Sequence, residues 1–263
     1  MLSAARRRTV FLPLLGGLVA LTWLALWAWA ASPYGRYLEH GGWADAGPLA
    51  ALCRAVPGGE IVVPALLYAL GWTAMTAAMM IPTAWPLLEI FGRLVGDRPD
   101  GVRLQALVVA GYLLVWAAFG LVAHVLDAAV LAAVGTVPWL AANGWALGAG
   151  VVALAGLYQF SDLKYRCLDK CRTPLSFVMQ HWRGKAPAQQ ALRLGIAHGA
   201  FCVGCCWALM LLMFVVGIGS IGWMLGIAAV MAIEKNVSWG RQLSAPLGCA
   251  LLAAAAAAVA INV

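Results

Sequence analysis

The chain has 263 residues, of which 64% are hydrophobic and 10% are charged, whereas a soluble domain carries about 25% charged residues. Its mean hydropathy is +0.89, and its net charge at pH 7 is +7. These values exclude an ordinary soluble domain, and seven cysteines spread over this length exclude a disulfide-stabilised secreted scaffold. We therefore expect an integral membrane protein, with a single membrane domain over residues 1–263.

Apolar stretches follow one another along the whole chain. A helical membrane crossing needs about 20 residues, and backbone amides in the hydrocarbon core must bond within their own segment, which favours helices. The expected fold class is all-α, with about seven transmembrane helices. They are predicted at residues 10–31, 61–90, 104–126, 139–160, 194–217, 219–233 and 245–262.

The first stretch has two interpretations. Arg6, Arg7 and Arg8 precede an apolar run that ends at Ala28-Trp29-Ala30, which is typical of a signal peptide with a small-residue cleavage site. The run of about 20 residues is longer than a typical signal core. We therefore favour a retained membrane anchor, with a cleaved signal peptide as the alternative.

The second stretch combines three methionines with a proline. Met75 and Met79 are one helical turn apart, Met80 follows, and Pro82 is expected to bend the helix. Methionines usually fill packing gaps, but thioethers are also ligands for soft metals. The course of this helix should bring them toward the cytoplasmic half of the bilayer.

The basic residues predict the orientation. If the crossings alternate from a cytoplasmic N-terminus, 15 of the 17 Lys and Arg residues lie on the inner side, seven of them in segment 161–193. Such a bias follows the positive-inside rule. We expect a cytoplasmic N-terminus and a cytoplasmic segment 161–193. Topology and anionic lipid explain the positive charge, so the lipid bilayer is an expected partner and nucleic acid is not.

Segment 161–193 also contains a cysteine pair. Cys167 and Cys171 share a face if the fourth helix continues, and Pro174 should end it. Four basic residues surround the pair, which favours the thiolate form. We expect these thiols to lie near water, at the cytoplasmic mouth of the fifth helix. The alternative is a basic loop whose cysteines are incidental.

The fifth stretch has the densest set of candidate ligands. His198, Cys202, Cys205 and Cys206 fall within about a 100° sector of one helical face. Sulfur donors select Cu(I), zinc or an iron–sulfur cluster over Mg²⁺ or Ca²⁺. One or two such cysteines would be ordinary core residues, but three within five residues, one turn after a histidine, predict a metal site. In contrast, Glu89 and Glu234 are interpreted as residues at a membrane boundary, where their charge can reach water.

These motifs resemble a bacterial family. The order Ala-Met-Met-Ile-Pro, then Cys-Leu-Asp-Lys-Cys-Arg-Thr-Pro, then His-Gly-Ala-Phe-Cys-Val-Gly-Cys-Cys-Trp, then Glu-Lys is similar to that of predicted metal-binding integral membrane proteins, formerly a domain of unknown function. The family is grouped with a membrane copper chaperone of a tyrosinase-type polyphenol oxidase. The resemblance covers about residues 60–240 and leaves out the last helix. It implies a location in the bacterial cytoplasmic membrane and these signature residues: Met79, Met80, Cys167, Cys171, His198, Cys202, Cys205 and Cys206.

We predict a membrane protein, not an enzyme, that binds Cu(I), with zinc as the alternative ion. It would capture the ion at Cys167 and Cys171, pass it to the stripe from His198 to Cys206, and release it to a copper-requiring partner protein. Two other functions stay open. One is a membrane thiol–disulfide oxidoreductase that exchanges electrons with quinone, and the other is a structural subunit whose cysteines only pack.

Overall fold

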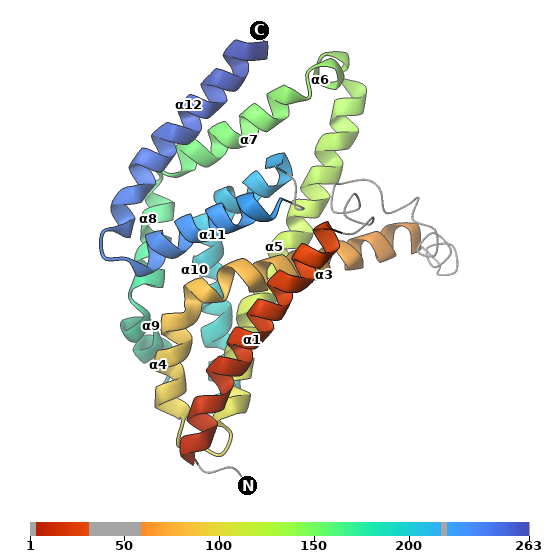
Figure 1. The fold of residues 1–263 in the computed structure, drawn as a ribbon. Helices are drawn as coiled ribbons and strands as arrows, with labels where there is room; N and C mark the ends of the chain where they lie inside the picture. Colours follow the sequence, from red (N-terminus) through yellow and green to blue (C-terminus); the bar gives the residue numbers. More distant parts are fainter. Residues whose placement is uncertain (1–3, 32–58, 217–219, 263) are drawn as a thin grey trace.

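The computed structural model describes residues 4–31, 59–216 and 220–262, and these parts of the chain contain helices and no strands (Figure 1). The all-α prediction is therefore confirmed. The helices are α1 (Ala4–Ala30), α3 (Gly59–Met80), α4 (Trp85–Val95), α5 (Gly101–Thr136), α6 (Pro138–Ala142), α7 (Trp145–Tyr158), α8 (Asp162–Arg172), α9 (Pro174–His181), α10 (Pro187–Val216), α11 (Ile221–Asn236) and α12 (Ser244–Asn262), with the short 3-10 helices η3 (Pro82–Ala84) and η4 (Gly240–Leu243).

Helix α10 is the central element of the bundle. It packs against α5, α7, α8, α9 and α11, and it carries three buried cysteines and two buried methionines. Small residues permit this close packing. A Cβ atom on Gly195 would overlap the backbone of Val108, and one on Gly199 would lie 3.1 Å from the carbonyl oxygen of Tyr112. Glycine thus lets α5 approach the backbone of α10 directly.

Four helices of the described chain are long and apolar enough to cross a membrane, and six if each of two bent pairs counts as one crossing. The sequence predicts seven. The difference lies in α11, whose 16 residues span about 24 Å at 1.5 Å per residue, less than the hydrocarbon thickness of about 30 Å.

Two bends interrupt the predicted second and fourth helices. The axis turns by 44° between Met80 and Pro82, as expected for a residue that lacks an amide hydrogen. It turns by 65° between α7 and α8, where Ser161 caps the new helix by accepting a hydrogen bond from the Lys164 amide at 3.2 Å. The fourth helix therefore does not continue straight, and α8 ends directly before Pro174 as predicted.

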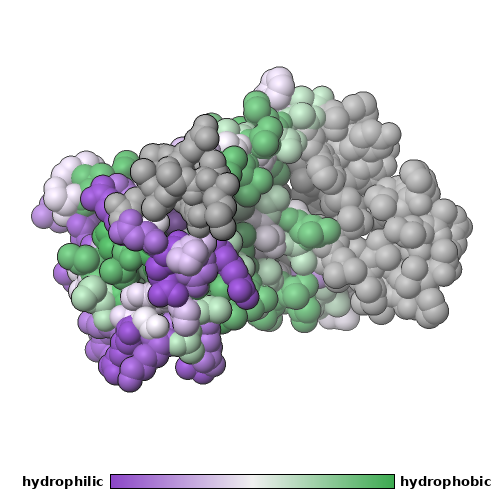
Figure 2. All heavy atoms as spheres, turned by 90° about the horizontal axis from the view of Figure 1, so that it is seen from below, coloured by the Kyte–Doolittle hydropathy of each residue, from purple (hydrophilic) through white to green (hydrophobic). Residues whose placement is uncertain are grey.

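The two ends of the molecule differ in character. Helix α1 starts at the lower end of the view in Figure 1, and α12 ends at the upper end. Seen from below, hydrophilic side chains gather on the lower face (Figure 2). Arg183 and Lys185 in the connection between α9 and α10 are exposed. An end rich in polar and basic side chains is what a membrane protein presents to water.

Candidate metal centre

Three thiols of α10 form the centre of the site. The sulfur atoms of Cys202, Cys205 and Cys206 all lie within 4.8 Å of one another, and all three residues are buried. Cys205 and Cys206 each donate a hydrogen bond to the Cys202 carbonyl oxygen, at 3.1 and 2.9 Å. Positions i, i+3 and i+4 lie on one face of a helix, and these bonds turn the two later thiols back toward the first.

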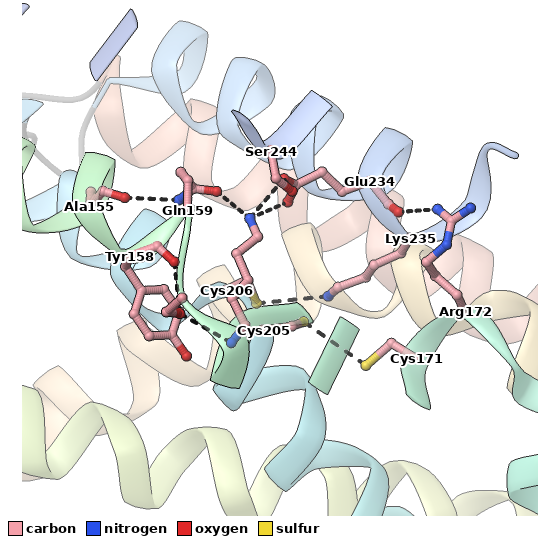
Figure 3. Close-up of polar contacts among 12 residues, drawn as sticks. Ala155, Tyr158, Gln159, Cys171, Arg172, Cys205, Cys206, Glu234, Lys235 and Ser244 are labelled. Carbon is pink, nitrogen blue, oxygen red and sulfur yellow. Dashed lines mark hydrogen bonds and ion pairs between the residues drawn. The ribbon is translucent and has the colours of Figure 1, made fainter. Parts of the chain in front are cut away.

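Helix α8 adds two more cysteines to this group. The sulfur atoms of Cys171 and Cys205 are 4.0 Å apart (Figure 3). Cys167, one turn earlier, packs on α10 so closely that a Cβ atom on Gly204 would lie 2.5 Å from its sulfur. Both α8 cysteines are buried, with 8% and 9% of their surface exposed. The expectation that this pair lies near water, apart from the α10 cysteines, is therefore wrong.

Helix α3 supplies a thioether. The sulfur atom of Met80 lies 3.9 Å from that of Cys206, because α3 ends at Met80 and turns at Pro82 beside the cysteines. Met75 and Met79 are equally buried and belong to the same hydrophobic core. Of the three methionines predicted as ligands, Met80 is the one for which the described structure gives a sulfur contact with a cysteine.

Lys235 of α11 reaches the same group of sulfur atoms. Its ammonium nitrogen lies 3.1 Å from the sulfur of Cys202 and 3.8 Å from those of Cys206 and Met80, and 3.2 Å from the hydroxyl of Thr83. Figure 3 shows Lys235 and Cys206 directed toward one another. The residue is 5% exposed, so its charge is buried with the sulfur atoms.

The neighbouring Glu234 belongs to a separate buried network. Its carboxylate accepts hydrogen bonds from the ammonium of Lys164 at 2.7 and 2.9 Å and from the hydroxyl of Ser244 at 2.6 Å. Lys164 also donates to the Gln159 side chain, and Arg172 donates to the Glu234 carbonyl oxygen. This network joins α8 and α12 to α11, and so fixes the helices that carry Cys171 and Lys235. Glu234 is thus a buried structural residue, and the expectation that its charge reaches water is wrong.

His198 stands apart from the thiols. The cluster of potential metal ligands in the described chain contains the three α10 cysteines and not His198. The imidazole instead stacks on Tyr112, with ring centroids 5.7 Å apart, and contacts Phe177 edge-on at 5.5 Å. The hydroxyl of Tyr112 lies 2.9 Å from the sulfur of Cys202. A position on the same helical face therefore does not by itself bring the imidazole to the sulfur atoms.

The donor set determines which ions the site suits. Five buried thiols and one thioether come from α3, α8 and α10, and no carboxylate of the described chain joins the cluster. Soft sulfur ligands favour Cu(I) or zinc over hard cations such as Mg²⁺ and Ca²⁺. Sequence reasoning missed Lys235, Thr83 and Tyr112. The signal for Lys235 was a charged residue in the last turn of an apolar helix, since ionisable residues within such helices are functional candidates by default.

Comparison with known proteins agrees with this chemistry. The family model PpoB2, described as a copper chaperone, matches residues 69–258. The match extends into α12, so the expectation that the last helix lies outside the family region is wrong. Searches of curated proteins and of solved structures give no match.

Proposed function

Because this chain belongs to the PpoB2 family of copper chaperones, we propose that it holds Cu(I) among the buried sulfur atoms and delivers it to a copper-requiring partner protein. The observation that carries this proposal is the arrangement of Cys202, Cys205 and Cys206, whose sulfur atoms lie within 4.8 Å of one another. Cu(I) binds readily to thiol and thioether sulfur. Zinc is the alternative ion, because four thiols can also provide a zinc site.

The location follows from the candidate membrane spans and the charge distribution. We propose that the chain crosses the bacterial cytoplasmic membrane seven times as one domain, with a cytoplasmic N-terminus. Its 15 basic residues on one predicted side, out of 17 in total, support this orientation. Nucleic acid is not a proposed partner. In this arrangement α11 is a short crossing, which local thinning of the bilayer accommodates.

The two cysteine motifs are proposed to act as one site. A relay from an exposed Cys167–Cys171 pair to a buried trio requires two separate clusters. The 4.0 Å between the sulfur atoms of Cys171 and Cys205 supports a shared site instead, in which ligands exchange without a long transfer step. Met80 is a further ligand in this proposal. Met75, Met79 and His198 surround the site and are less favoured as ligands of the ion.

Metal analysis of the purified protein tests the proposal. Protein prepared under reducing conditions should carry copper, and a variant without the α10 thiols should lose it. The second candidate function is a thiol–disulfide oxidoreductase, and the observation that favours it is the close pair of Cys171 and Cys205. Such a protein would show a change in free thiols without bound metal. Thiol titration with and without copper distinguishes the two.

A further inference from the structure

The ammonium group of Lys235 lies where a cation bound to the cluster would lie. It faces the sulfur atoms of Cys202, Cys206 and Met80 at 3.1, 3.8 and 3.8 Å. These atoms belong to α10 and α3, while Lys235 belongs to α11. One nitrogen atom thus stands between ligands of two helices and carries one positive charge, like Cu(I).

The surroundings of Lys235 are unusual for a buried lysine. A buried charge is costly unless an opposite charge pairs with it. The nearest acidic residue in sequence, Glu234, is occupied by Lys164 and Ser244, and among the described residues Lys235 makes no ion pair with a carboxylate. Its polar partner besides sulfur is the hydroxyl of Thr83, at 3.2 Å. The chain therefore places this positive charge specifically at the sulfur cluster.

We propose that Lys235 competes with the copper ion for the same sulfur atoms. Loading moves the ammonium away from Cys202 and Cys206, and its return favours release of the ion to the partner. This inference rests on the proposed copper function. Two like charges at such short range repel each other strongly where water is excluded. The lysine side chain has four methylene groups and can move, and Thr83 offers a contact that needs no sulfur atom.

A charge that competes for the sulfur atoms would help the protein to release the ion to its partner. A buried site of several thiols with no opposing charge would retain Cu(I) strongly, whereas a chaperone must also release it. Lys235 is thus a positioning residue that sets how tightly the ion is held. It contacts the ligands and is itself no ligand, because a lysine ammonium offers donors and no free electron pair.

The test compares the full-length protein with its Lys235→Met and Lys235→Gln variants in detergent under reducing conditions. A chromophoric Cu(I) chelator reports both the affinity for Cu(I) and the rate of transfer to excess chelator. We expect both variants to bind Cu(I) at least about tenfold more tightly, which corresponds to about 1.4 kcal/mol, and to release it more slowly. Lys235→Arg retains the charge and should remain close to the original protein. Lys170→Met, at an exposed lysine of α8, is the matched control.

The outcomes separate the two proposals. Unchanged or weaker copper binding in folded Lys235→Met and Lys235→Gln would overturn the competitor role, and weaker binding would identify Lys235 as a charge that the bound ion needs. If neither the original protein nor the variants bind Cu(I), the proposed function fails and the inference with it. Among the described residues Lys235 makes no ion pair with a carboxylate, so Lys235→Met leaves no buried carboxylate without its partner, and thermal unfolding should confirm that this variant folds.

Discussion

Cys171 of α8 and Cys205 of α10 lie with their sulfur atoms 4.0 Å apart, although 34 positions separate them in the sequence. This contact joins the two cysteine motifs into one buried group. The 65° bend between α7 and α8 makes it possible, because it directs α8 back across α10. Copper bound at one motif would therefore be within reach of the other.

The first prediction concerns this contact. Cys171→Ser should lower the copper content of the purified protein by a similar fraction to Cys205→Ser, because both remove a thiol from the same site. Metal analysis and protein quantification give the ratio. Cys249→Ser removes an exposed thiol of α12 and should leave the ratio unchanged. Full copper content in Cys171→Ser would show that the α8 cysteines lie outside the site.

The second prediction concerns the buried ion pair between Lys164 and Glu234, whose side chains are 0% and 2% exposed. Lys164→Met leaves the carboxylate buried and unpaired, which should lower the free energy of unfolding by about 3–5 kcal/mol. Thermal or denaturant unfolding in detergent measures the change.

The double variant Lys164→Met with Glu234→Leu is the matched control for this pair. Because it removes both charges, it should recover most of the lost stability. A single variant as stable as the original protein would contradict the structural role of the pair.

The third prediction concerns the packing of α10 on α5. Gly195→Ala places a methyl group against the backbone of Val108. The methyl group fits only if the backbone of α5 or α10 shifts. The variant should lose about 1–3 kcal/mol of stability and some copper, because α10 carries the three central thiols. Gly150→Ala is the control, since a Cβ atom there meets nothing within 4 Å. Equal melting temperatures for the two variants would refute the close approach.

The fourth prediction concerns topology. With a cytoplasmic N-terminus and seven crossings, a reporter that is active only outside the cytoplasm should work when fused after Val263 and fail when fused near Gly184. The physical reason is the excess of Lys and Arg on the predicted inner side. Activity at Gly184 would reverse the orientation. Inactivity at both sites would indicate that α11 does not cross.

Much of the fold could be predicted because hydrophobic segments of sufficient length form helices in a membrane. The bend at Pro82 followed from the missing amide hydrogen of proline. The bend between α7 and α8 could not be predicted in the same way. It depends on a cap at Ser161 and on the Lys164–Glu234 pair, and a contact between residues 70 positions apart leaves no local signal.

The candidate site was predicted in part. Helical spacing correctly placed Cys202, Cys205 and Cys206 on one face, because three and four residues make about one turn. Spacing could not predict that Tyr112, and not His198, has its polar atom beside Cys202, since this depends on α5. The basic residues around Cys167 and Cys171 suggested thiols near water. Arg166 and Lys170 are indeed exposed, but Lys164 is buried together with both cysteines.

The most direct test of the central claim is the copper content of protein purified under reducing conditions, compared with the variant in which Cys202, Cys205 and Cys206 are all replaced by Ser. We predict close to stoichiometric copper in the original protein and loss of most of it in the variant, with Cys249→Ser unaffected. Zinc in place of copper would retain the site and overturn the ion. Equal copper in the original protein and the triple variant would contradict the account.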